Sequence, residues 1–477
     1  MLLVGIAMLA MPMAKAENID VDKVKDAAAH YLKHTTSLER ITADQLSLDH
    51  TWTNPVSGNP TMYLFTTSGE GWIIMSAEST VDPVVAYSDE STINPDCLGE
   101  SLQWWLDGYN SIISEMQNLY ARVDLGSHPD WDMLLNHKMK GNTKEESIKL
   151  IESKWDQGNV KGTDYNMLSP VINDTTCPAG CVATAMAQIM YYYKYPAKAT
   201  GYINYKPKQY VDRIIVNFAD SAILDYSIMP IQVLPYSTPT VQRMEISRLQ
   251  FYAGVSVKMS YGPSGSGAYS QDVPSAMKNR FKYELGTLNY RMSLGDSAFV
   301  QAIRDELMNK HLVYMSGSST TGSDAHAAGH AWVCGGYRVV NTKMYYMNWG
   351  WDGSGNGWYN LGDNNMPISS MGYNFIKGQG AIFGMVPPAD SLLAINEAEQ
   401  SGFQLGRAYP NPASVAVNIP YHTSASAELV IYSVDGRVVR SQRVEAGEGE
   451  VSLRVDAMPA GVYIYRLGSG YGKFVVR

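Results

Sequence analysis

The feature that most constrains the fold is a short apolar helix that cannot begin before residue 180. Apolar residues recur at the i, i+3, i+4, i+7 and i+8 spacing of a buried helix, at Val182, Ala185, Met186, Ile189 and Met190. The preceding Cys177-Pro178-Ala179-Gly180 cannot continue that helix, so Cys181 falls in its first turn. The free N–H groups and the positive end of the helix dipole stabilise an anion there, so Cys181 is expected to favour thiolate over thiol. The alternative is a small buried hydrophobe, which is the commonest fate of a free cysteine.

A reactive thiolate needs a base, and two later segments offer one together with a partner. His330 lies in Gly329-His330-Ala331-Trp332-Val333, which is typical of the start of a core strand. Asn348 ends a second apolar run and is followed by Trp-Gly-Trp at 349–351, so its amide is placed to orient an imidazole under an aromatic lid. Nucleophile, base and amide follow one another in this order in papain-like enzymes.

An acyl-transfer reaction also needs a hydrogen-bond donor for its oxyanion, and Gln157 is the candidate. It lies in Lys154-Trp155-Asp156-Gln157-Gly158, a loop-like segment upstream of Cys181. Its side-chain N–H, paired with the backbone N–H of Cys181, would form an oxyanion hole. An ordinary surface glutamine is the alternative interpretation of this segment.

From about 141 to 388 the chain resembles the streptopain family of papain-fold cysteine peptidases, and especially its interpain-type members. The resemblance rests on Gly-Cys-Val-Ala-Thr-Ala at 180–185, Ala-Gln-Ile-Met at 187–190, Tyr-Gly-Pro-Ser at 261–264, Gly-His-Ala at 329–331 and Asn-Trp-Gly-Trp at 348–351. It implies an endopeptidase that hydrolyses proteins and peptides through an acyl-enzyme, without cofactor or metal. The implied roles are Cys181 as nucleophile, His330 as base, Asn348 as its orienting amide, Gln157 in the oxyanion hole and Trp349 as a shield over the His–Asn hydrogen bond.

The part of the chain before this region fits a secreted precursor. Residues 1–16 form an apolar run ending Ala14-Lys15-Ala16, the small-x-small pattern of a signal-peptide cleavage site. Residues 17–140 are expected to be an α+β domain with helices over Val21–Lys33 and Leu102–Arg122 and strands over 62–65, 71–76 and 84–87. This domain resembles the family's inhibitory propeptide, so the chain's own prodomain would silence the enzyme. The polar stretch 137–144, with three lysines, is predicted to be an exposed linker where activating cleavage falls.

The C-terminal part is expected to be a small, separate β-sandwich. Residues 389–404 are small and polar and suit a linker. Short strands follow at regular spacing, with Leu429–Val434 and Arg437–Arg440 flanking an Asp-Gly turn and further strands at 461–467 and 473–477. Residues 405–477 resemble the sorting domain of type IX secretion cargo. The secretion machinery is therefore an expected partner, and the protein is expected to be secreted or held at the outer cell surface.

Composition excludes several classes of protein. Thirty-seven basic residues against 46 acidic ones give a net charge of −9, and no basic run is long enough to follow a phosphate backbone, so nucleic acid is not expected as a partner. No later stretch approaches 18 uninterrupted apolar residues, so no transmembrane span is expected. Four cysteines in 477 residues cannot form a disulfide framework. Cys177 and Cys334 are expected to be packed, although a Cys177–Cys181 bridge would block the nucleophile reversibly.

Two histidine- and cysteine-containing patterns could indicate a metal site. A zinc site at Cys177, Cys181, His326, His330 and Cys334 lacks the Glu of a His-Glu-x-x-His helix and has an unusual cysteine spacing, so no metal is expected. His30 and His34, four residues apart, are interpreted as a solvated helix face.

Two further functions compete with that of an endopeptidase. One is a catalytically silent surface adhesin on a peptidase scaffold, and the second is acyl transfer to amines by the same Cys–His pair. An intact set of Gln157, Cys181, His330 and Asn348 argues against the adhesin, since a decayed scaffold is expected to lose at least one of them. The predicted fold class is α+β: a papain-like catalytic domain preceded by an α+β prodomain and followed by a small all-β sandwich.

Overall fold

The structure is a computed structural model of the chain. It describes residues 18–120, 127–139, 146–158, 160–208, 212–318, 329–340, 342–362, 375–376, 378–389, 391, 403–406, 408–423, 425–433, 437–467 and 470–477. The predicted signal peptide at 1–16 lies outside these residues. The chain divides into two compact units, Met1–Val386 and Pro387–Arg477. The described part has no helix that is long and apolar enough to cross a membrane.

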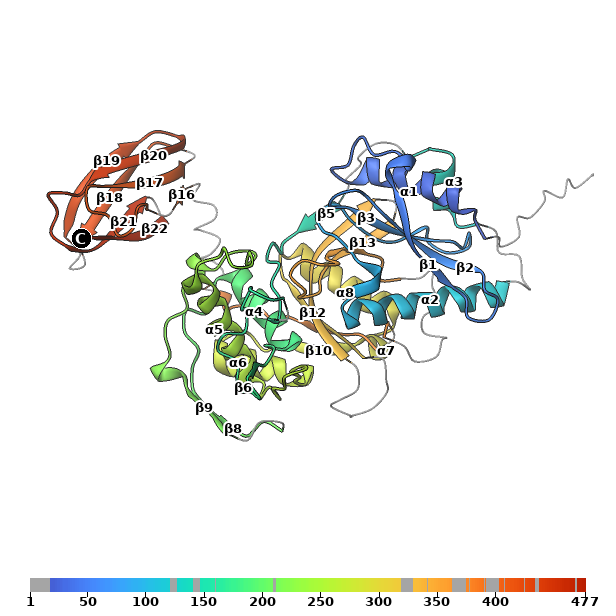
Figure 1. Cartoon of the computed structure of the whole chain (residues 1–477), viewed down its shortest axis with the longest axis horizontal. Coiled ribbons are helices and arrows are strands. Elements are labelled where there is room, and N and C mark those ends of the chain that lie inside the picture. Colours follow the sequence, from blue (N-terminus) through green and yellow to red (C-terminus); the bar gives the residue numbers. More distant parts are fainter. Residues whose placement is uncertain are drawn as a thin grey trace, which may run out of the picture. The chain divides into compact units, whose positions relative to one another are not determined.

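The first unit contains both the predicted prodomain and the predicted catalytic domain (Figure 1). Its helices are α1 Val21–Thr35, α2 Glu100–Tyr120, α3 Pro129–Leu135, α4 Cys181–Tyr193, α5 Thr240–Ser256, α6 Val273–Phe281, α7 Arg291–Leu294 and α8 Asp296–Met308. Its strands are β1 Ser47–Thr53, β2 Pro60–Thr66, β3 Trp72–Ser76, β4 Val84–Ser88, β5 Glu146–Lys149, β6 Val171–Ile172, β7 Thr175–Thr176, β8 Tyr202–Tyr205, β9 Ile214–Asn217, β10 Thr287–Tyr290, β11 Val313–Ser318, β12 Gly329–Val340, β13 Thr342–Asn348, β14 Gly357–Tyr359 and β15 Gly380–Phe383.

The predicted elements of the prodomain are present with small shifts at their ends. Helix α1 begins where the Asp20 carboxylate accepts the Asp22 N–H at 3.0 Å, and it buries one face of alanines and Leu32. The three predicted strands correspond to β2, β3 and β4, while β1 was missed because its residues are largely polar and only Trp52 is buried. Helix α2 begins two residues before the predicted start, and residues 121–126 lie outside the described part of the chain.

The predicted exposed linker at 137–144 is exposed at His137 and Lys138, although both side chains also pair with carboxylates of the preceding domain. His137 Nε2 lies 2.7 Å from the Asp26 carboxylate, and Lys138 Nζ lies 2.8 Å from the Asp132 carboxylate. The Met139 side chain is buried. These contacts tie the segment to α1 and α3 of the prodomain, whereas residues 140–144 lie outside the described part of the chain.

A single antiparallel sheet of eleven described strands joins prodomain and catalytic domain. Its order is β1-β2-β3-β4-β14-β13-β12-β11-β15-β10, with β5 paired to β12. The junction is the β4–β14 pair, in which Tyr87 faces Trp358 and Ala86 faces Tyr359. Gly357 is needed beside it, since a Cβ there would lie 2.6 Å from the Tyr87 carbonyl oxygen. The chain therefore closes the edge of its catalytic sheet with its own prodomain.

The hydrophobic core is also continuous across this junction. One cluster of buried side chains includes Trp72 and Trp105 of the prodomain together with Trp349 and Tyr359 of the catalytic domain. Trp105 meets the Tyr359 ring edge-on with centroids 4.9 Å apart. On the other side of the catalytic domain α4 packs against α5, and α4 also contacts β12 (Figure 1). This arrangement places the start of α4 next to the start of β12.

The second unit is a β-sandwich, as predicted. Its strands are β16 Phe403–Leu405, β17 Ala416–Thr423, β18 Ala427–Ser433, β19 Val438–Val444, β20 Gly447–Arg454, β21 Gly461–Leu467 and β22 Gly470–Val476. They form one sheet of order β16-β17-β20 and one of order β19-β18-β21-β22. Buried residues of both sheets, such as Ile419 and Ile431, share one core. The predicted β18–β19 hairpin is confirmed, and its Asp-Gly turn lies outside the described residues.

Candidate active site

Cys181 is the first residue of α4, as the helix pattern predicts. The chain enters the helix through Gly180, whose φ of 91° is strained for any residue with a side chain. A Cβ at Gly180 would also lie 2.9 Å from the Ser266 carbonyl oxygen. The backbone N–H groups of Ala331, Val182 and Cys181 itself favour the thiolate form of the Cys181 side chain. The thiol therefore lies near both the start of α4 and the start of β12.

The expected preference of Cys181 for thiolate is not present in this state. Desolvation raises the pKa of the Cys181 thiol above its usual value, and the nearby backbone N–H groups only partly offset that rise. The helix terminus supplies the predicted N–H groups, but desolvation of the sulfur outweighs them. The thiol is neutral at pH 7 as the structure stands.

His330 lies at the start of β12, where its strand was predicted. Its Nε2 is 2.8 Å from the carbonyl oxygen of Trp349, and no hydrogen bond joins it to Cys181 or Asn348 among the described residues. The side chain is 7% exposed, and burial lowers its pKa to about 4, with the Trp349 carbonyl acting in the opposite direction. The imidazole is therefore neutral at pH 7 and bound to the backbone rather than to the thiol.

Asn348 does not hold His330 in this structure, which corrects the predicted contact. Its Nδ2 donates to the Ser153 carbonyl oxygen and to Gln188 Oε1, the latter at 2.9 Å. Its Oδ1 accepts from Gln188 Nε2 at 3.3 Å and from the Gly350 N–H at 3.1 Å. An amide offers two donors and two acceptor sites, so this side chain has no capacity left for the imidazole.

The loop that carries Gln157 is hydrogen bonded to the segment that leads into Cys181. The Gln157 backbone carbonyl accepts the Ala179 N–H at 2.8 Å. The neighbouring Asp156 carboxylate accepts the Gly158 N–H at 2.6 Å and fixes the turn. Gln157 is buried, so the alternative of a surface glutamine is wrong.

Three tryptophans surround the imidazole, and the predicted shield is not the nearest of them. The Trp351 ring lies parallel to the His330 ring, with centroids 5.5 Å apart and planes 9° apart. Trp332 is also parallel at 6.3 Å, whereas Trp349 is tilted at 6.5 Å. Trp349 is fully buried and serves the core, while Trp351 covers the histidine.

The prodomain reaches His330 through Trp351. The Trp351 Nε1–H donates to the Ser101 hydroxyl at 3.2 Å, at the start of α2. Gly99 lies directly against the same indole, since a Cβ there would be 2.6 Å from Nε1. The prodomain therefore contacts the Trp351 ring, which in turn stacks against the His330 imidazole.

Sequence reasoning missed four polar residues of the site: Ser153, Thr184, Gln188 and Gln250. All four are buried and hydrogen bonded to the segments that carry the predicted residues. The available signal was the spacing on α4, where Thr184 and Gln188 follow Cys181 at i+3 and i+7 on a helix that is otherwise apolar. A polar side chain at such a position is hydrogen bonded in nearly every folded protein.

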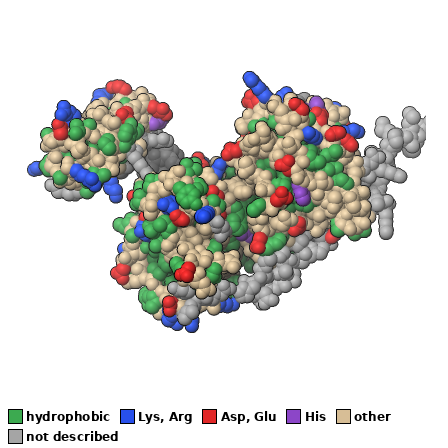
Figure 2. Space-filling model, viewed as in Figure 1, with side chains coloured by type: hydrophobic (Ala, Val, Ile, Leu, Met, Phe, Trp, Pro, Cys, Tyr) green, Lys and Arg blue, Asp and Glu red, His purple; other side chains and the backbone are tan. Residues whose placement is uncertain are grey.

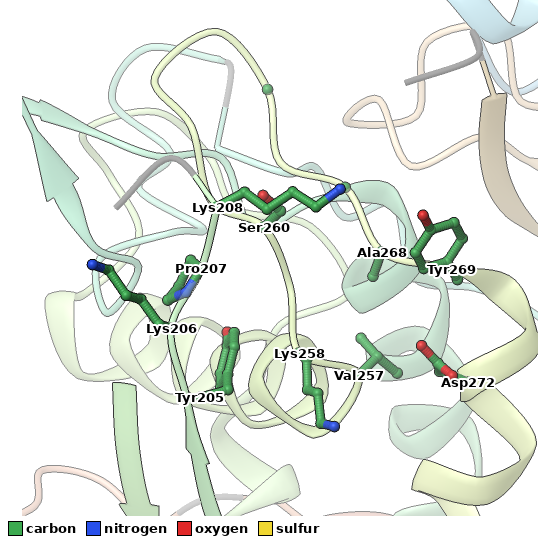
Figure 3. Close-up of a pocket in the computed structure, with 12 residues that line it drawn as sticks. Tyr205, Lys206, Pro207, Lys208, Val257, Lys258, Ser260, Ala268, Tyr269 and Asp272 are labelled. Atoms are coloured by element: carbon green, nitrogen blue, oxygen red, sulfur yellow. The ribbon is translucent and has the colours of Figure 1, made fainter. Parts of the chain in front are cut away.

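A pocket of about 360 Å³ adjoins the loop that contacts Gly180 (Figure 3). Its walls include Tyr205, Val257 and Ala268, and Lys206, Lys208 and Lys258 stand at its rim. Figure 3 shows the three lysine side chains running in different directions, so their ammonium groups do not converge on one point. On the face shown in Figure 2, acidic and basic side chains are likewise interspersed.

The remaining cysteines are free thiols, and Cys177 and Cys181 form no bridge. Cys177 and Cys334 are buried, as expected of packed residues, and burial raises the pKa of the Cys334 thiol to about 12. In the described part of the chain, groups with metal-ligand geometry are limited to Asp82, His128 and Asp130. His128 Nδ1 accepts the Asp130 N–H, so its Nε2 carries a proton toward Asp82 and is not available to a metal.

His30 and His34 are not a simple solvated face, which corrects that interpretation. His30 is half-buried, and its ring stacks on His137 with centroids 4.6 Å apart. Burial, with the neighbouring His34 and His137, lowers the His30 pKa to about 4. The helix face is covered by the segment that follows α3, which the sequence pattern did not indicate.

Comparison with known proteins assigns three regions of the chain to known families. Residues 155–359 match the Peptidase C10 family, residues 16–113 the Spi protease inhibitor family, and residues 407–477 the secretion system C-terminal sorting domain. Streptopain of Streptococcus pyogenes serotype M1 is 27% identical over 81% of this chain and 97% of its own length. The thiol protease/hemagglutinin PrtT of Porphyromonas gingivalis is 27% identical over 74% of this chain, which spans 40% of PrtT. A prointerpain A fragment of Prevotella intermedia shares the fold with a TM-score of 0.56, at 22% identity, over 72% of this chain and 99% of the fragment.

These matches define a cysteine-type peptidase. The chain carries a region that matches the C10 peptidase family, preceded by a region that matches a protease inhibitor family and followed by a sorting domain. The sorting domain indicates secretion and surface attachment.

Proposed function

We propose that this protein is an exported cysteine endopeptidase in which Cys181 is the nucleophile, His330 the general base and acid, and Gln157 an oxyanion donor. The observation that carries the proposal is the convergence at the start of α4. There the backbone N–H of Ala331, the residue after His330, acts on the Cys181 thiol, and the Gln157 carbonyl oxygen accepts the Ala179 N–H at 2.8 Å. Three segments far apart in the sequence thus meet around the start of α4.

The proposed reaction follows from the chemistry of these groups. His330 takes the thiol proton, and the Cys181 sulfur attacks the carbonyl carbon of a peptide bond. The resulting oxyanion is held by the Cys181 N–H and the Gln157 amide. The imidazolium then protonates the departing amine, which leaves an acyl-enzyme. Water, deprotonated by the same imidazole, releases the carboxylic acid and frees the thiol.

In the precursor the same groups are held apart. A carbonyl oxygen can only accept, so His330 Nε2 carries the proton and donates it to the Trp349 carbonyl oxygen. The Trp351 ring stacks on the imidazole. The same ring packs against Gly99 and donates a hydrogen bond to the Ser101 hydroxyl, both in the prodomain. Removal of residues 17–140 would release Trp351 and let the imidazole turn toward Cys181. The inhibition proposed is thus displacement of the base by an intramolecular inhibitor.

The test is hydrolysis of casein by activated wild-type protein and by Cys181→Ala and His330→Ala variants. Both variants should be silent, because neither can form the thiolate–imidazolium pair. Cys97→Ala is the matched control, since Cys97 is an exposed thiol in the prodomain and should be dispensable. Casein hydrolysis by Cys181→Ala at the wild-type rate would contradict the proposal. A lack of casein hydrolysis by the activated wild-type protein would instead favour a catalytically silent adhesin.

The export route is the second part of the proposal. Residues 405–477 resemble type IX cargo and fold as a separate compact unit, so we expect them to direct passage across an outer membrane. Truncation after residue 400 should retain the protein inside the cell and leave the purified enzyme active. Normal export of the truncated chain, with loss of peptidase activity, would contradict this assignment.

A further inference from the structure

The helix that bears the nucleophile has a buried polar face that the reaction itself does not explain. Thr184 and Gln188 lie on the same side of α4 as Cys181, and each is about 1% exposed. Gln250, on the neighbouring helix α5, is fully buried. An unpaired polar group in such a place is costly, so these side chains are held by specific partners.

Gln188 joins the nucleophile helix to the segment that holds the histidine. It exchanges two hydrogen bonds with the Asn348 amide, at 2.9 and 3.3 Å. Its Oε1 also accepts the Ser153 hydroxyl at 2.9 Å. Asn348 directly precedes Trp349, whose carbonyl oxygen binds His330 Nε2 at 2.8 Å. The orientation of the peptide that receives the imidazole is therefore set by a side chain of α4.

Gln250 joins the same helix to the loop that carries the oxyanion donor. Its Oε1 accepts the Thr184 hydroxyl, and its Nε2 donates to the Asp156 carbonyl oxygen at 3.1 Å. The Nε2 donates also to the Tyr165 carbonyl oxygen at 3.2 Å. Asp156 directly precedes Gln157, so the position of Gln157 relative to Cys181 depends on this bridge.

We infer that Gln188 and Gln250 are positioning residues that fix, respectively, the Asn348–Trp349 segment beside His330 and the loop of the oxyanion donor relative to the helix that bears Cys181. The inference rests on the proposed function and adds to it two residues that touch neither substrate nor reacting atoms. Each acts through a different catalytic partner, so the two substitutions should have different signatures. Loss of the Gln188 contacts affects proton transfer, whereas loss of the Gln250 contacts affects oxyanion binding alone.

The experiment compares Gln188→Met and Gln250→Met, which keep the side-chain length and remove the hydrogen bonds. The full chain is allowed to activate, and rates are normalised to the number of alkylatable active-site thiols. Both variants should lose about tenfold to a hundredfold in kcat with KM nearly unchanged, which is the scale of a small misplacement of catalytic groups. Only Gln188→Met should also shift the basic limb of the kcat/KM profile, because loss of the imidazolium proton from the thiolate–imidazolium pair sets that limb.

Gln379→Met is the matched control, since Gln379 is equally buried but binds Arg291 Nη1 at 3.1 Å, away from the site. It should keep the wild-type kcat and pH profile. Should Gln188→Met fail to fold, Ser153→Ala removes one bond to Gln188 and should shift the same limb by less. Wild-type kcat and pH profiles in Gln188→Met or Ser153→Ala, with Cys181→Ala silent, would overturn the inference and leave the proposed function intact. Equal losses in Gln379→Met would also overturn it.

Discussion

At the scale of single residues, burial decides the charge of the two reacting groups. Desolvation raises the pKa of the Cys181 thiol despite its place at a helix start, and it lowers the pKa of His330 to about 4. Both groups are therefore neutral at pH 7, and the ion pair that a cysteine peptidase needs does not exist in this state. The proposed inactivity of the precursor would follow from these protonation states as well as from access to the cleft.

The buried Gln157 should matter to the chemical step and not to substrate binding. We expect Gln157→Ala to lower kcat by about a hundredfold with KM little changed, since one donor to the oxyanion is lost. Peptide hydrolysis by the activated enzyme is the measurement. Gln301→Ala, at an exposed position on α8, should match the wild type. A large rise in KM at constant kcat would instead assign Gln157 to substrate binding.

At the scale of elements, the start of α2 is the part of the prodomain that reaches the active site. Gly99, which directly precedes α2, and Ser101 in its first turn contact the Trp351 indole, and the Trp351 ring lies over His330. The absence of a Cβ at Gly99 is what allows the helix to approach so closely. The packing of one helix start against one ring thus links the inhibitor domain to the base.

Gly99→Val should weaken the packing of the prodomain against Trp351 of the catalytic domain. The added side chain would collide with Trp351, since even its Cβ lies 2.6 Å from the indole nitrogen. We expect the uncut variant to react faster with a thiol alkylator than the parent, both carrying Cys97→Ala to remove the exposed thiol. Gly69→Val is the control, because a Cβ there meets no atom within 4 Å. Equal alkylation rates in Gly99→Val and parent would show that this contact does not restrain the site.

At the scale of the whole molecule, prodomain and catalytic domain form one folded unit rather than two domains in contact. They share a sheet through β4 and β14 and a core through Trp105 and Tyr359. The buried Arg338 of β12 donates to the Tyr87 hydroxyl at 2.8 Å and to the Thr35 carbonyl oxygen at 3.2 Å, both in the prodomain. The proposed removal of the prodomain would therefore expose apolar surface and a sheet edge.

The stability of the precursor should rise with pH between about 4 and 6.5 because of His330. Its pKa is lowered to about 4 in the folded state, so the unfolded chain binds more protons in that range. In a Cys181→Ala precursor, the free energy of unfolding should fall from pH 7 to pH 5, and less so once His330→Gln is added. Proton NMR of the imidazole should show titration near pH 4.

Two further groups require control in that experiment. Burial also lowers the pKa of His30 to about 4, so His30→Gln should remove a second part of the same pH dependence. Burial raises the pKa of Asp352 to about 6, and this carboxyl acts with the opposite sign, stabilising the fold at lower pH. Two results together would show that burial does not hold His330 neutral. The pH dependence of the unfolding free energy would be the same in the His330→Gln variant, and the His330 imidazole of the parent protein would titrate near pH 6.5.

The sequence by itself determined the elements and the residue types of the site. The 3.6-residue period and the Pro-Ala-Gly entry placed Cys181 at the start of α4, and apolar runs placed His330 and Asn348 on strands, because these patterns depend on neighbours along the chain. Only the tertiary structure decided the partners of these residues. Asn348 binds Gln188 instead of His330, and Trp351 rather than Trp349 covers the imidazole. Hydrogen bonds and burial depend on which segments meet in space, and local periodicity carries no information about that.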